Sequence, residues 1–146
     1  MARTVSVAKE RLIAADPAAV WFVVSNPAMH ERLDARSRLE STVGNDGQIG
    51  SEYVVVFSAG AKFRIRYVIV DAEPNVRLVA AVSTGGTKQE QRADIWPTGE
   101  GTLLRFTVTL PAPWFVLTRR TVTRAVARQM EKWLSAVERE ALLVSR

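Results

Sequence analysis

The chain has 146 residues, of which 47% are hydrophobic and 24% are charged, and its net charge is +5. These values predict one folded domain, residues 1–146, and exclude disordered and fibrous proteins. The sequence contains no cysteine, which excludes disulfides and cysteine–zinc sites. No segment approaches the roughly 18 apolar residues of a membrane span, and charged residues interrupt the N-terminal segment where a signal peptide would be apolar. We therefore expect a cytoplasmic protein without integral membrane association.

The 20 basic residues are spread among 15 acidic residues in the same segments. A nucleic-acid-binding surface typically combines clustered basic residues with exposed aromatic side chains, and the sequence contains no such cluster. We therefore expect no nucleic-acid partner.

After a first strand over residues 4–14, the segment ADPAAVWFVVSNPAMHERL predicts a short helix and a helical turn. Asp16 is a good N-cap, Pro17 suits a first helical turn, and Asn26 precedes a proline that ends the helix. We expect the helix and the turn over 17–25 and 27–33. Apolar side chains point to every side of this helix: Val20, Trp21, Phe22, Val23 and Val24. Such a helix is typically covered on all sides.

A series of strands follows to about residue 110, separated by turn signals at 44–47, 58–61, 73–75, 85–86 and 98–101. Turn lengths predict the register, with four-residue loops at 72–75 and 98–101 and a two-residue turn at 85–86. The expected facing pairs are Arg77 with Asp94, Asp94 with Arg105, and Ile69 with Leu78. The 58–61 turn leaves two registers open, with Tyr53, Val55 and Phe57 inward or Val54 and Val56 inward.

The register predicts an antiparallel sheet with one dry face and one solvated face. The dry face is expected to carry Phe63, Ile65, Tyr67, Ile69, Val76, Leu78, Ala80, Leu104, Phe106, Val108 and Leu110. From about Pro113 the period changes, and apolar residues recur at steps of three and four: Val122, Val126, Met130, Trp133, Val137 and Ala141. We expect one C-terminal helix of about 28 residues. A line of basic residues on this helix fits either an anion-binding surface or, as we favour, its solvated back: Arg120, Arg124, Arg128 and Lys132.

The sequence resembles the START/polyketide cyclase-like (SRPBCC) superfamily. The resemblance is carried by LIAADPAAVW (12–21) leading to SNP, by AEPNVRL (72–78), by WPTGEGTLLRFTV (96–108) and by the long terminal helix. It implies an α+β helix-grip fold, in which a curved antiparallel β-sheet grips the C-terminal helix and two short helices follow the first strand. It also implies a hydrophobic cavity between sheet and helix. The helix over 17–25 would then be covered by the sheet, by the C-terminal helix and by the cavity or its lid. Leu33 stands where many relatives have tryptophan, which leaves the subfamily open.

The residues indicate few chemical groups for this cavity. His30 is the only histidine, so a histidine-based metal site is excluded, and we expect no metal and no cofactor. We interpret His30 itself as a solvated surface residue. The register turns Gln89 and Gln91 inward, where they fit hydrogen bonds to a ligand or, alternatively, to the backbone or Tyr67. The first strand presents either Lys9 and Arg11 or Glu10 to the interior, where a charge would bind a polar ligand head or extend to water.

We therefore predict a cavity that binds a small lipid-like, aromatic or polyketide-like ligand. Its expected lining is Tyr67, Ala80, Gln89, Gln91, Phe106, Val126 and Met130. One alternative is an enzyme of the polyketide cyclase/dehydrase type, with Tyr67, Gln91, Arg11 or His30 guiding proton transfer. The other is a protein-interaction domain of the chaperone-activator type, with a protein partner and a collapsed cavity.

Overall fold

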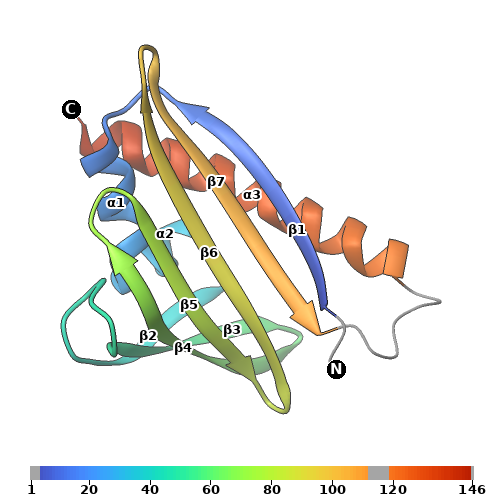
Figure 1. The fold of residues 1–146 in the computed structure, drawn as a ribbon. Helices are drawn as coiled ribbons and strands as arrows, with labels where there is room; N and C mark the ends of the chain where they lie inside the picture. The colour runs from blue at the N-terminus through green and yellow to red at the C-terminus, as the bar shows by residue number, and fades with distance from the viewer. Residues whose placement is uncertain (1–3, 112–118, 146) are drawn as a thin grey trace.

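The structure, a computed structural model, describes residues 4–111 and 119–145. Seven strands form one antiparallel sheet in the order β1-β7-β6-β5-β4-β3-β2. Their bounds are β1 Thr4–Ile13, β2 Ser37–Val43, β3 Glu52–Ala59, β4 Ala61–Glu73, β5 Arg77–Thr84, β6 Thr87–Thr98 and β7 Gly101–Pro111. The long helix α3 (Arg119–Val144) crosses one face of the sheet, and the strands curve around it (Figure 1). This is the predicted α+β helix-grip arrangement.

Helix α1 (Pro17–Ser25) begins and ends where its capping residues predict. The Asp16 carboxylate accepts a hydrogen bond from the backbone N–H of Ala19 at 2.8 Å, and the side chain of Asn26 accepts one from Ala28 at 3.1 Å. The latter begins the helical turn, which consists of η1 (Pro27–Met29) and α2 (His30–Leu33). Local capping chemistry therefore sets both short helices.

The expectation that α1 is covered on all sides is wrong. Ala19, Val20 and Val23 are buried against α3 and the sheet, but Phe22 on the opposite side is 46% exposed. The helix lies at one end of the molecule, beside the C-terminal part of α3, so one side faces solvent (Figure 1). A single exposed aromatic residue is ordinary on a protein surface.

Two of the three turn-based registers are confirmed. Arg77 faces Asp94 across β5 and β6, and Asp94 faces Arg105 across β6 and β7. The register at 58–61 is also settled, because Tyr53 faces Tyr67 and lies inward. Pairing of opposite charges and of apolar side chains across strands makes such registers readable from sequence.

The register at 72–75 is wrong by two residues. Glu73 pairs with Arg77, so the loop has three residues, with Asn75 in the left-handed region at φ 66°. A β-bulge between Ile69 and Asp71 absorbs one residue, and Ile69 faces Ala80 instead of Leu78. Because the displacement is an even number of residues, Tyr67, Ile69, Leu78 and Ala80 keep their inward face. The expectation that Phe63 and Val76 lie on the dry face is wrong, because they are 44% and 40% exposed.

The buried core lies between the inward face of the sheet and the helices α1 and α3. On α3, Met130, Val137 and Ala141 of the predicted stripe are buried, together with Leu134, which the stripe did not include. The expected helix start near Pro113 lies outside the described residues. Within the described part of the chain, no helix has the length and apolar character needed to span a membrane.

Element lengths explain why the sheet is not covered evenly. Helix α3 has 26 residues and is about 39 Å long, whereas α1 has nine residues and is about 14 Å long. Strands β4, β6 and β7 have 11 to 13 residues and match α3 in length. Helix α1 therefore fills only one end of the space under the sheet, and the other end lies between β-strands and the N-terminal half of α3.

Candidate functional site

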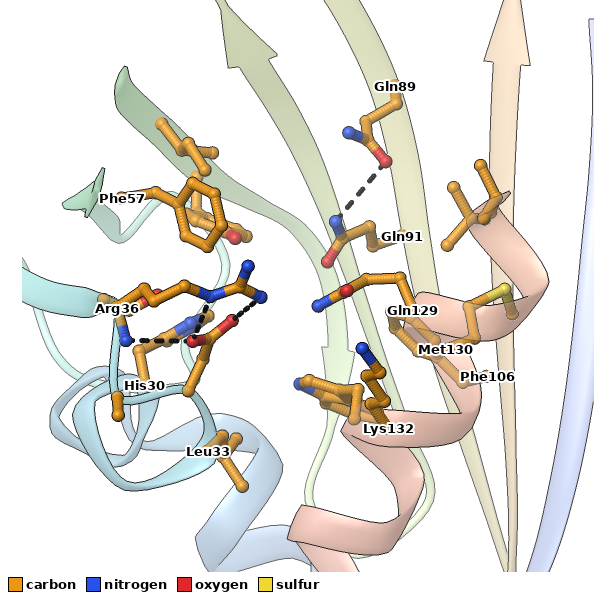
Figure 2. A pocket seen from close by; sticks show the side chains of 18 of the residues that line it. His30, Leu33, Arg36, Phe57, Gln89, Gln91, Phe106, Gln129, Met130 and Lys132 are labelled. Atoms are coloured by element: carbon orange, nitrogen blue, oxygen red, sulfur yellow. Dashed lines mark hydrogen bonds and ion pairs between the residues drawn. The ribbon is translucent and has the colours of Figure 1, made fainter. Parts of the chain in front are cut away.

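A pocket of about 630 Å³ occupies that second end. Strands β3, β4, β6 and β7 form one wall, α3 forms another, and residues 30–37 form the rim (Figure 2). Just over half of its lining residues are apolar: Leu33, Ala35, Phe57, Ile65, Phe106, Val108, Leu110, Val126, Met130 and Trp133. The rings of Phe106 and Trp133 stack with centroids 4.2 Å apart, which joins β7 to α3 at the base of the pocket.

Six of the seven predicted lining residues belong to the pocket wall: Tyr67, Gln89, Gln91, Phe106, Val126 and Met130. Ala80 does not, and this part of the predicted lining is wrong. Ala80 is 6% exposed and lies in the packed core between its larger cross-strand partners Ile69 and Gln91. That the six residues bind a ligand stays a prediction.

The two inward glutamines bond to each other. The amide Nε2 of Gln91 donates to Oε1 of Gln89 at 3.4 Å, and both side chains are half-buried. Among the described residues, neither the backbone nor Tyr67, the alternative partners expected from the sequence, donates to or accepts from these two side chains. One long amide–amide bond leaves most of the donors and acceptors of this pair available to a molecule in the pocket.

His30 is not the solvated residue that the sequence suggested. Its Nε2 lies 3.0 Å from the hydroxyl of Tyr53, whose ring stacks on Tyr67 at 4.6 Å. The His30 ring centroid is 5.0 Å from that of Tyr67. Burial lowers the pKa of His30 to about 4 and raises the pKa of Tyr67 to about 12, so both groups are neutral at pH 7.

The burial of His30 predicts a loss of stability on mild acidification. Its pKa is about 4 in the folded chain and about 6.5 in the unfolded chain, so below pH 6.5 the unfolded state binds the extra proton. The free energy of unfolding should fall by about 2 kcal/mol between pH 8 and pH 5. Urea unfolding at several pH values measures this loss. Because His30 is the only histidine, His30→Gln should remove most of it; an unchanged pH dependence in this variant would contradict the assignment.

An ion pair forms part of the rim. Arg36 donates from Nε and Nη2 to the two carboxylate oxygens of Asp34, both at 3.1 Å, and from its backbone N–H at 2.9 Å. Burial alone would raise the pKa of Asp34, but the hydrogen bonds and charge of Arg36 and the charge of Lys132 hold it below its usual value. The Arg36 guanidinium also lies 4.7 Å from the Phe57 ring centroid. Arg36 is thereby fixed over the pocket wall.

Sequence reasoning missed several lining residues, among them Asp34, Arg36, Gln129 and Lys132. Lys132 was expected on the solvated back of the C-terminal helix. Gln129 lies three residues after Val126 and four before Trp133, and Lys132 lies three residues after Gln129, so a helix places them beside the apolar stripe. Their spacing from the apolar stripe could therefore have predicted that they lie near the pocket. The rim pair had no such signal, because residues 34–37 connect two elements and show no hydrophobic period.

The charge on β1 does not enter the pocket. The odd positions face inward, as Val7 and Ile13 show by their burial. Arg11, however, donates to Ser135 at 2.8 Å, and it forms ion pairs with Glu138 at 3.2 Å and Glu131 at 3.4 Å on α3. Neither Lys9 nor Arg11 is among the lining residues. Arg11 therefore fastens the edge strand to the helix.

Comparisons with known proteins agree with this geometry. A family model described as "Polyketide cyclase / dehydrase and lipid transport" matches residues 4–141. A protein of unknown function from Staphylococcus aureus has a TM-score of 0.81 to this chain at 12% identity, and the match covers 97% of this chain and 96% of that protein. Ara h 8.0201 has a TM-score of 0.74 at 17% identity, and the match covers 96% of this chain and 99% of Ara h 8.0201. Norcoclaurine synthase from Thalictrum flavum, solved with dopamine and hydroxybenzaldehyde, has a TM-score of 0.68 at 21% identity, covering 97% and 88%. No curated protein matches the sequence significantly.

Proposed function

Because the chain belongs to the polyketide cyclase / dehydrase and lipid transport family, we propose that it is a single domain that binds a small hydrophobic ligand. The ligand is lipid-like, aromatic or polyketide-like and lies between the sheet and α3. The observation that carries this proposal is the largely apolar wall of the 630 Å³ pocket, with a few amides and one ion pair. Pockets for small molecules typically have this composition and a volume of about 300–1,000 Å³.

Further support comes from the neutral groups under the pocket and from a structural neighbour. Both His30 and Tyr67 are uncharged at pH 7 because burial shifts their pKa values, so an apolar molecule meets no unpaired charge on that side. The norcoclaurine synthase of the same fold was solved with two small aromatic molecules. The absence of cysteine fits a cytoplasmic location, which we also propose.

Two measurements test the proposal. Native mass spectrometry of freshly purified protein should detect a retained small molecule, and Nile red, a neutral hydrophobic dye, should bind with a rise in fluorescence. Heating the protein past its unfolding transition should release the dye. A protein that retains no molecule and never binds the dye would contradict the proposal.

An enzymatic role is the second candidate, and the contact of His30 with Tyr53 beside Tyr67 favours it. A neutral imidazole at a pocket wall can accept a proton, and Tyr67 lines the same pocket. A pKa of about 4 makes His30 a weak base, which is why ligand binding is the first proposal. Arg11, which the sequence analysis also named for proton transfer, forms ion pairs with two glutamates of α3 and is not part of this candidate.

Proton exchange tests this candidate. The protein should accelerate exchange of the acidic C–H of benzoylacetone, an aromatic β-diketone, in deuterated water followed by NMR. His30→Gln should lose the acceleration and still bind Nile red. Exchange at the rate of buffer alone in the parent protein would count against an enzymatic role. The chaperone-activator alternative assumed a collapsed cavity, and an open pocket of this size gives it no support.

A further inference from the structure

The pocket carries one positive charge that its own residues do not compensate. Its charged lining residues are Asp34, Arg36 and Lys132. Arg36 is bound by Asp34 through both guanidinium and backbone, whereas Lys132 forms no ion pair with the residues described. His30 is neutral at pH 7. The lining therefore holds a net charge of +1. Lys132 is its one cation without an ion pair among the described residues, although its charge also acts on Asp34.

Amide donors surround this charge. Gln129 lies three residues before Lys132 on α3, so their side chains are neighbours on one side of the helix. Figure 2 shows the amides of Gln91 and Gln129 and the end of Lys132 directed toward the space between β6 and α3. Only the Gln89–Gln91 bond, at 3.4 Å, engages these amides among the described residues. The site thus offers a cation and free N–H donors together, which is the donor set for an anion.

The apolar part of the pocket begins next to this polar group. Val126 lies two turns of α3 before Trp133, and Val108 and Leu110 of β7 belong to the same wall. A molecule with its charged end at Lys132 can therefore place an apolar body against Val126 and β7 without burying a charge. Apolar side chains therefore lie directly beside the polar group, since Gln91 faces Val108 across β6 and β7, and an amphiphile can contact both.

We propose, building on the proposed function, that the preferred ligand is an amphiphile with a single carboxylate, which binds Lys132 and the amides of Gln129 and Gln91. One uncompensated charge matches a monoanion. A phosphate monoester carries a second charge that this lining does not match. A neutral alcohol of the same chain length leaves Lys132 unpaired and gains only the apolar contacts.

Isothermal titration calorimetry at pH 7.5 with decanoate, decanol and decyl phosphate tests this inference. Decanoate should bind the parent protein about fivefold more tightly than decanol, the size of one partly exposed ion pair. Decyl phosphate should bind no more tightly than decanoate. In 1 M salt the advantage of decanoate over decanol should shrink, because the Debye length falls to about 3 Å.

Two variants locate the effect. Lys132→Gln should bring decanoate and decanol within about twofold of each other, because it removes the charge and keeps a polar side chain. Arg128→Gln is the matched control: Arg128 is exposed one turn earlier on α3 and does not line the pocket, so its decanoate preference should equal that of the parent. Both positions are exposed, so both variants should have the melting temperature of the parent.

The outcomes separate the two proposals. If neither decanoate nor decanol binds the parent, the proposed function itself fails. If both bind equally, or if Lys132→Gln keeps the preference for decanoate, the pocket is hydrophobic and the head-group assignment is wrong. Tighter binding of decyl phosphate than of decanoate would overturn the choice of a carboxylate.

Discussion

Replacing Val126 with tryptophan should abolish Nile red binding and leave the fold intact. Val126 is half-buried on α3 and lines the pocket, so the larger side chain enters empty space instead of a packed core. The indole extends from α3 toward the sheet and obstructs the space between them that the dye must enter. Overpacking is destabilising in a filled core, where it costs about 1–3 kcal/mol, and should be mild here. The dye titration and the melting temperature measure the two effects separately.

Ala125→Trp is the matched control for this variant. Ala125 is the preceding residue, is exposed and does not line the pocket, so the same indole should leave the affinity for Nile red unchanged. If both variants lose the dye, the loss comes from a general disturbance of α3. If Val126→Trp binds the dye as the parent does, the dye occupies another place and the pocket assignment fails.

The position of Ala80 shows where sequence reasoning about the pocket stops. Its inward orientation follows from alternation along β5, and the structure confirms that orientation. Whether an inward residue meets a void or its neighbours depends on how far α1 and α3 reach along the sheet. Helix lengths and crossing positions are set by long-range packing, which the local pattern does not contain.

The sheet register shows the opposite case. Turn lengths and facing charges placed Arg77, Asp94 and Arg105 correctly, because strand pairing is a local property of hairpins. The same logic failed at 72–75, where a bulge and a left-handed Asn75 changed the loop. Bulges insert a residue without a distinct sequence signal, so the face was predictable there and the exact pair was not.

His30 is a failure of a different kind. Its neighbours Glu31 and Arg32 are polar and indicated a solvated turn, but the imidazole reaches Tyr53 on β3, 23 residues away in sequence. Only the packing of α2 against the sheet creates the low pKa of this residue. The chemistry of the site therefore depends on tertiary contacts, even where the fold does not.

Val137→Asp should prevent folding under native conditions. Val137 is 0% exposed and belongs to the apolar core beneath α3. Burying an unpaired carboxylate is among the most destabilising single changes, and we expect a loss of about 4 kcal/mol or more. Most domains of this size have a total stability of about 5–15 kcal/mol. Circular dichroism and urea unfolding measure the result.

Two further variants separate the charge from the lost contacts. Val137→Ala removes the same apolar side chain without adding charge and should destabilise the fold by about 2 kcal/mol. Leu143→Asp introduces the same carboxylate on α3 at a residue that is 52% exposed, and it should cost less than about 1 kcal/mol, because water solvates the charge and only the helix dipole opposes it. If Val137→Asp and Leu143→Asp have the same melting temperature, this side of α3 does not face the core. If the sheet covers this side of α3, the free energy of unfolding should decrease in the order parent, Leu143→Asp, Val137→Ala, Val137→Asp.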